Sequence, residues 1–90
     1  MEEQLEKLLK IPGAEGSMVV GKDGLVIAVV GSFQPDPDSF GASIAEILGN
    51  LDTRFSSRGA LQRMVVEADS GQVHVVAINE VTFLVAQLAL

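Results

Sequence analysis

One segment near the start of the chain has the composition of a phosphate-binding loop. Gly21-Lys22-Asp23-Gly24 places a lysine between glycines, which would let a backbone approach a phosphate while an ammonium group balances its charge. A nucleotide-binding P-loop needs G-x-x-x-x-G-K-[ST], with Ser or Thr after the lysine to bind Mg²⁺. Asp23 stands in that place, and the glycine spacing is missing. The segment is therefore predicted to be a hairpin turn, because Asp-Gly suits positive φ, and no GTP binding is expected there.

The remaining candidates for acid–base, nucleophilic or metal chemistry also have plainer explanations. His74 is the only histidine and the chain has no cysteine, so a catalytic zinc site is not expected. In its predicted strand His74 shares a face with Val76 and Ile78, which favours a partly buried structural histidine. The serines lack a nucleophile context such as G-x-S-x-G. The sequence therefore predicts no catalytic residue, no metal and no cofactor, and the chain is not expected to be an enzyme.

Two groups of charged residues, at and just beyond the ends of a predicted long helix, allow two interpretations each. Asp36 and Asp38 could act as acid and base or hold a cation, but the Asp-Pro-Asp-Ser context favours a helix start. Arg54, Arg58 and Arg63 could include an arginine finger that enters the nucleotide site of a partner protein. Arg54 and Arg58 lie one turn apart, so a favourable interaction with the helix C-terminus is preferred.

These residues must be positioned by a small α+β domain. Hydrophobic periodicity, turn residues and helix-cap signals predict the order helix, two strands, helix, three strands. Short turns make each linked pair of strands antiparallel, so a five-stranded antiparallel sheet follows in one domain covering residues 1–90. The predicted elements are a helix at Glu2–Lys10, strands at Met18–Val20 and Leu25–Val30, a helix from Asp36 to about Ser57, and strands at Leu61–Ala68, Gln72–Ile78 and Val81–Leu88.

The long helix carries two stripes. At 100° per residue one apolar stripe is predicted to face the sheet; it contains Phe40, Ile44, Ile47, Leu48, Leu51 and Phe55. A neighbouring stripe is made of very small residues, namely Gly41, Ala42, Ala45 and Gly49. Small residues at this spacing allow another backbone to approach closely. The stripe is interpreted either as a contact with the same helix of a second subunit or as a close fit to the chain's own sheet and first helix.

Composition narrows the classes of partner. The chain has 90 residues, a formal net charge of −6, and neither Trp nor Tyr. The negative charge opposes nucleic acid and anionic membrane surfaces, and the lack of stacking aromatics argues against single-stranded nucleic acid. No apolar run approaches the ~20 residues of a membrane span. A cysteine-free chain of this kind is expected in the cytoplasm.

The first thirty residues resemble the Roadblock/dynein light chain domain family. A short leucine helix runs into I-P-G-x-x-G at 11–16, followed by a strand, the Asp23-Gly24 turn and G-L-V-I-A at 24–28. The Ala- and Ile-rich helix and Met64-Val65-Val66-Glu67 followed by Gly71 fit the same pattern. The resemblance covers nearly the whole chain and is of the bacterial or archaeal MglB-like kind.

This resemblance implies a non-catalytic homodimer that regulates or scaffolds a Ras-like small GTPase of the MglA type and modulates its nucleotide cycle. Such domains pair their third strands edge to edge and lay their long helices side by side. By position, the strand pairing would use Leu61 to Glu67, including Leu61, Arg63, Val65 and Glu67. The helix contact would use Gly41, Ala42, Ala45, Glu46, Gly49 and Thr53. The alternative is a structural adaptor that pairs with another Roadblock-like chain and contacts no GTPase.

The sequence departs from many members in one respect. They continue after the last strand into a further helix, whereas this sequence stops at Leu90. The sheet face that such a helix covers is then expected to depend more on the first helix or on a partner.

Overall fold

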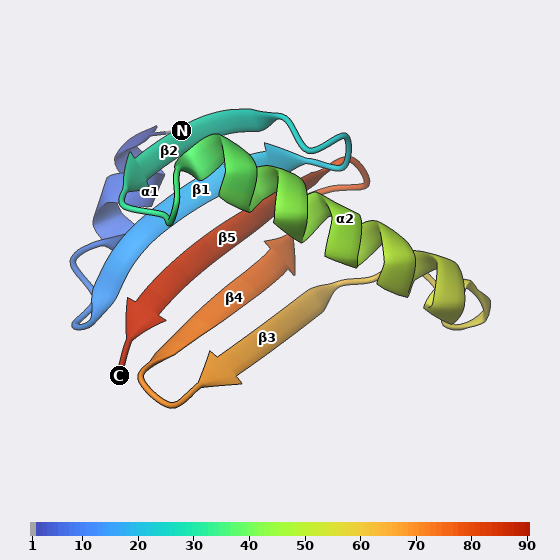
Figure 1. The fold of residues 1–90 in the computed structure, drawn as a ribbon. Helices are drawn as coiled ribbons and strands as arrows, with labels where there is room; N and C mark the ends of the chain where they lie inside the picture. Colours follow the sequence, from blue (N-terminus) through green and yellow to red (C-terminus); the bar gives the residue numbers. More distant parts are fainter. Residues whose placement is uncertain (1) are drawn as a thin grey trace.

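The fold is α+β, as the sequence predicts, with one five-stranded antiparallel sheet and two α-helices (Figure 1). The computed structural model describes residues 2–90. Its elements are α1 (Glu2–Leu8), β1 (Ala14–Gly21), β2 (Val26–Gly31), α2 (Pro37–Phe55), the 3₁₀ turn η1 (Ser56–Arg58), β3 (Arg63–Ala68), β4 (Gly71–Ala77) and β5 (Thr82–Ala89).

The strand order is β2-β1-β5-β4-β3, and every neighbouring pair is antiparallel. The three hairpins predicted from short turns are all present. The pairing of β1 with β5 joins the two halves of the chain, with Met18 opposite Val85 and Val20 opposite Phe83. The order leaves β2 and β3 as the two edges of the sheet.

The core lies between the sheet and α2. Side chains alternate across a strand, so Met18 and Val20 of β1 face α2 while Ser17 and Val19 face the other way. Met18 and Val20 join a buried cluster with Phe33, Ile44, Leu48, Val75, Phe83 and Val85. The cluster is mainly aliphatic, in keeping with four Phe as the only aromatics of the sequence.

Helix α1 covers the opposite face of β1 and β2. Its Leu5 side chain is buried, and the fully buried Ser17 Oγ donates a hydrogen bond to the Leu5 carbonyl at 3.0 Å. The last carbonyls of a helix have no partner within it, so Ser17 satisfies one of them. The helix ends at Leu8, two residues before the predicted Lys10, because 3₁₀-type turns follow from Glu6 to Ile11.

Helix α2 begins as predicted. Asp36 is its N-cap, and the Asp36 carboxylate accepts hydrogen bonds from the Ser39 N–H at 2.8 Å and from Ser39 Oγ at 3.1 Å. Pro37 opens the helix, where its missing N–H costs nothing. Gly59, at φ +100°, follows η1 and turns the chain away.

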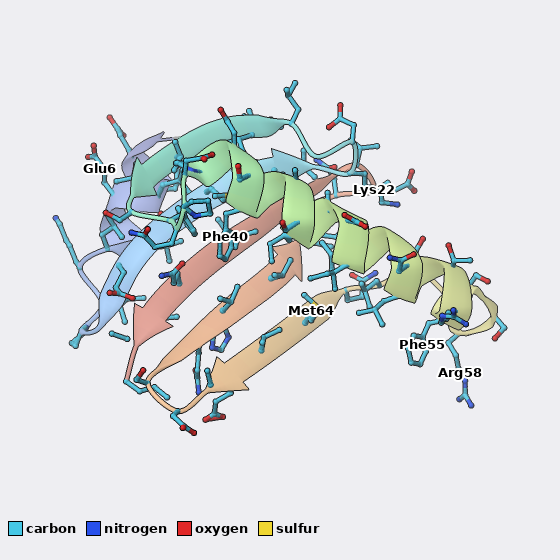
Figure 2. The ribbon with its side chains drawn as sticks, viewed as in Figure 1. Glu6, Lys22, Phe40, Phe55, Arg58 and Met64 are labelled. Atoms are coloured by element: carbon cyan, nitrogen blue, oxygen red, sulfur yellow. The ribbon has the colours of Figure 1, made fainter. Side chains whose placement is uncertain are left out.

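The predicted core stripe of α2 is correct only in part. Ile44 and Leu48 are buried, but Ile47 is 45% exposed and Phe55 is 53% exposed. Figure 1 shows that α2 crosses the sheet diagonally from β2 and that its C-terminal end, where Figure 2 labels Phe55, extends past the strands. The expectation that Ile47 and Phe55 face the sheet is therefore wrong.

The predicted third strand starts two residues too early. β3 begins at Arg63, whereas Leu61 is half-buried against the core of its own chain, and the Leu61 N–H donates to Asp52 Oδ1 at 3.4 Å. The first strand conversely begins earlier than predicted, at Ala14, because its pairing with β5 continues past a bulge to Ala14, which lies opposite Leu88.

Candidate self-association surface

Strand β3 has an open edge. It has a neighbouring strand on one side only, and it forms the lower border of the sheet in Figure 1. The Ala77 N–H donates to the Gln62 carbonyl at 2.9 Å, which makes Gln62 and Ala77 a hydrogen-bonded pair. Hydrogen-bonded and non-hydrogen-bonded pairs alternate along an antiparallel ladder. The backbones of Met64 and Val66 therefore bond β4.

The positions in between direct their backbone groups outward. Arg63, Val65 and Glu67 lie opposite Val76, His74 and Gln72 at the non-hydrogen-bonded pairs. Their N–H and C=O groups point away from β4, into the space beside the sheet. An edge of this kind is a template for another strand, and it includes three of the residues that the family resemblance assigns to a strand pairing.

Both faces of β3 carry apolar side chains that this chain leaves open. Val65, on the face away from α2, is 49% exposed, and Val66, on the α2 face, is 50% exposed. Met64 is half-buried against the core. Valines that are about half exposed on both faces of an edge strand indicate that the hydrophobic core can continue beyond β3.

One flank of α2 faces this open part of the sheet. Phe40 points from the helix toward the strands (Figure 2) and lines a hollow of about 360 Å³ with Val66, Val73 and Gln87. Ile47 follows seven residues later, and two helical turns bring it to the same flank. The exposed Ile47 side chain therefore lies on the flank that looks toward β3. Sequence reasoning missed this because it assigned Ile47 to the core.

The stripe of small residues lies elsewhere. Gly41 is buried, and a Cβ built on it would lie 2.6 Å from Val26 Cγ2 and 3.3 Å from Val20 Cγ2. Ala45 is 9% exposed. The expectation that Gly41 and Ala45 offer an outer surface is wrong, because they fit α2 closely to its own sheet.

The other predicted helix residues are on the surface. Ala42, Glu46, Gly49 and Thr53 are exposed, and a Cβ on Gly49 would meet nothing within 4 Å. Ala42 borders the β1–β2 turn, since a Cβ on Gly24 would lie 3.5 Å from Ala42 Cα. Contact of these four residues with a second helix stays a prediction.

The lysine-containing loop is a hairpin turn, as predicted. The Gly24 N–H donates to the Gly21 carbonyl at 2.9 Å, and Gly24 has φ +87°. Asp23 Oδ1 accepts from the Leu25 N–H at 3.0 Å. The turn is thus closed by its own backbone and by Asp23.

The other candidates for chemistry lie on different elements or their ends. His74 is half-buried in β4, with Nε2 2.8 Å from Gln72 Oε1. Arg54 and Arg58 are exposed at the C-terminal end of α2 and in η1, and Figure 2 shows Arg58 projecting away from the sheet. Arg63 is exposed at the start of β3.

A larger hollow of about 690 Å³ lies between the second half of α2 and the β4–β5 turn. No sequence motif indicates this hollow, because its lining comes from separate segments. Leu48, Leu61 and Val81 supply apolar walls. Two of its polar side chains bond the chain's own backbone: Asp52 accepts from Leu61, and Asn79 accepts from Val81 and Thr82. These groups stabilise turns.

The sequence itself decides the family. The family model described as the Roadblock/LC7 domain matches residues 1–88. The chain belongs to the Roadblock/LC7 family. Two uncharacterized proteins of Methanocaldococcus jannaschii are each 35% identical to this Roadblock/LC7 chain over 78 residues, which cover 84% of the chain and 68% of either relative.

Solved structures of other Roadblock domains share the fold. The Roadblock/LC7 domain from Streptomyces avermitilis matches with a TM-score of 0.85 at 22% identity, covering 99% of this chain and 78% of that one. The gliding protein MglB from Thermus thermophilus matches with a TM-score of 0.87 at 20% identity, covering 98% and 70%. Myxococcus xanthus MglB matches with a TM-score of 0.81 at 19% identity, covering 92% and 70%.

Within residues 2–90, no helix has the length and apolar character needed to cross a membrane.

Proposed function

We propose that this Roadblock domain is a non-catalytic homodimer that binds a Ras-like small GTPase of the MglA type in the cytoplasm and modulates its nucleotide cycle. The observation that carries the proposal is the open edge of β3, where three consecutive outward positions offer backbone donors and acceptors. Membership of the Roadblock/LC7 family supports a regulatory or scaffolding role.

The geometry supports self-association at β3. A second β3 placed against the first would satisfy the outward amides and carbonyls and would join two sheets into one. Val66 and the α2 flank with Phe40 and Ile47 would then lie beside the seam, where a second α2 can cover them. In this arrangement the exposed apolar groups on the α2 side are explained together with the open edge.

The GTPase is the further part of the proposal. It is supported by the resemblance to MglB-type Roadblock domains and by the likeness of the fold to MglB. The net charge of −6 suits a partner that offers a basic patch. Because Arg54 and Arg58 lie at and just beyond the C-terminal end of α2, where they interact favourably with the helix dipole, stimulation would come from ordering the catalytic loops of the GTPase itself.

Two measurements test the parts separately. Sedimentation at several concentrations should show a dimer. A pull-down with a purified MglA-type GTPase, loaded with GDP or with a non-hydrolysable GTP analogue, should show retention that depends on the nucleotide. A dimer that retains neither form supports the alternative function, a structural adaptor without GTPase contact. A monomer at all concentrations would overturn the proposal.

A further inference from the structure

Strand β3 carries opposite charges on either side of a valine, at the three positions whose backbones face outward. Arg63, Val65 and Glu67 share the face away from α2, and all three are exposed. Glu67 comes four positions after Arg63, which is about 13 Å along a strand. The two side chains are therefore too far apart along one strand to pair well with each other, although their charges are complementary.

We propose that β3 recognises a second copy of itself in one register, with the two-fold axis at Val65. Arg63 then lies opposite Glu67 of the partner subunit, and Glu67 opposite the partner's Arg63. This inference rests on the homodimer proposed above and specifies how the two copies align. Side chains directly opposite each other across antiparallel strands have Cβ atoms about 4.5–5.5 Å apart, within reach of an ion pair.

The pattern of charges selects this register. The two strands can pair only through residues whose backbone N–H and C=O groups face outward, because the backbones of Met64 and Val66 are already hydrogen-bonded to β4. A two-fold axis at Arg63 would place Arg63 opposite the partner's Arg63, and an axis at Glu67 would place Glu67 opposite the partner's Glu67. Both arrangements bring like charges together and are repulsive. Axes at Met64 or Val66 would set one charged residue opposite Val65.

Only a two-fold axis at Val65 places each charged residue opposite one of opposite charge and also places apolar side chains opposite each other on both faces of the sheet. On the face away from α2, Val65 meets the partner's Val65 between the two ion pairs. On the α2 face, Met64 lies opposite the partner's Val66. The apolar layer under α2 would thus continue across the seam, and Val66, which is 50% exposed in one chain, would gain a neighbour.

Reversing one charge tests the pairing. Arg63→Glu gives a chain with glutamate at both positions, and Glu67→Arg gives a chain with arginine at both. Each variant alone opposes like charges twice in the proposed register, so its dimer dissociation constant should rise at least about tenfold. Mixed together, the two variants should form a heterodimer within about threefold of the wild-type affinity. Native mass spectrometry distinguishes the species by mass, and circular dichroism checks that each variant folds.

Single cysteines report the register independently, because the chain has no cysteine of its own. A hydrogen-bonded antiparallel pair has Cα atoms about 5.5 Å apart, which a disulfide can bridge. Under mild oxidation Val65→Cys should form a covalent dimer. Arg63→Cys alone should not, since the two copies would lie about 13 Å apart, whereas Arg63→Cys mixed with Glu67→Cys should cross-link.

The outcomes separate this inference from the homodimer itself. If wild-type protein sediments as a monomer, the proposed function fails and the register fails with it. If the wild type is a dimer but Val65→Cys stays uncross-linked, the register alone is wrong. The same holds if the two charge variants remain apart on mixing while the wild type is a dimer.

Discussion

At the scale of single residues, Ser17 is the polar side chain on which the position of α1 depends. It is fully buried, and its Oγ bonds the Leu5 carbonyl, which lies in the last turn of α1. In Ser17→Ala this carbonyl loses its buried partner, and unsatisfied buried groups cost about 1–3 kcal/mol. We expect the free energy of unfolding in urea to fall by about that amount. Hydrogen exchange in α1 should also become faster.

Ser43→Ala is the matched control, because Ser43 is exposed on α2. Surface substitutions usually change the free energy of unfolding by less than about 0.5 kcal/mol. Equal losses in the two variants would contradict the role given to Ser17.

The exposed arginines of α2 and η1 give a second residue-scale prediction, conditional on GTPase stimulation. An arginine finger contributes about 10³–10⁵ in the rate of GTP hydrolysis. Arg54→Ala and Arg58→Ala should change stimulation by less than about tenfold if the domain acts by ordering the GTPase's own loops. Single-turnover hydrolysis at saturating domain measures this. A thousandfold loss in either variant would make that arginine catalytic.

The helix cap and the tight turn, which depend on neighbouring residues, could be predicted from the sequence. The Asp36 cap and the Asp23-Gly24 turn are decided by hydrogen bonds within three residues, and both predictions are confirmed. The roles of Gly41 and Ala45 were not readable, because they depend on which way α2 rotates on the sheet. The close approach of Val26 to Gly41 is a contact between segments that no local pattern contains.

At the scale of elements, proline substitutions separate the two sides of β3. Proline lacks the backbone N–H and is tolerated on a strand edge only where that N–H faces outward. The Val65 N–H points away from β4, so Val65→Pro should keep the fold and abolish the dimer. The Val66 N–H bonds β4, so Val66→Pro should lose folded signal in circular dichroism. Sedimentation and thermal melts measure the two effects, and a folded dimer of Val65→Pro would contradict the edge pairing.

Elements formed by neighbouring residues were predicted more reliably than their long-range arrangement. The three hairpins follow from their turns, and each is confirmed. The pairing of β1 with β5 joins residues about seventy positions apart, and no periodicity indicates it. The exposed end of α2 has the same origin: the helix wheel identifies an apolar stripe, but the diagonal crossing decides which part of it meets the sheet.

At the scale of the whole molecule, apolar surface remains on both sides of the sheet. The seven-residue α1 covers β1 and β2 and leaves Val65 and Val76 of β3 and β4 exposed. On the α2 side, Val66 and Ile47 are about half exposed. A chain of this size buries only about 60–65% of the surface of its unfolded form. Association should therefore contribute much of the stability of the assembled protein.

This coupling makes stability depend on protein concentration. When folded chains are paired, mass action links unfolding to dissociation, and each tenfold rise in concentration adds about 1.4 kcal/mol to the stability of the dimer. The melting temperature of the wild type should rise steadily across about two orders of magnitude in concentration. Val65→Pro, as a folded monomer, should melt at one temperature throughout and below the wild type at high concentration. Concentration-independent melting of the wild type would show that β3 and the α2 flank contribute nothing to the fold through a second copy.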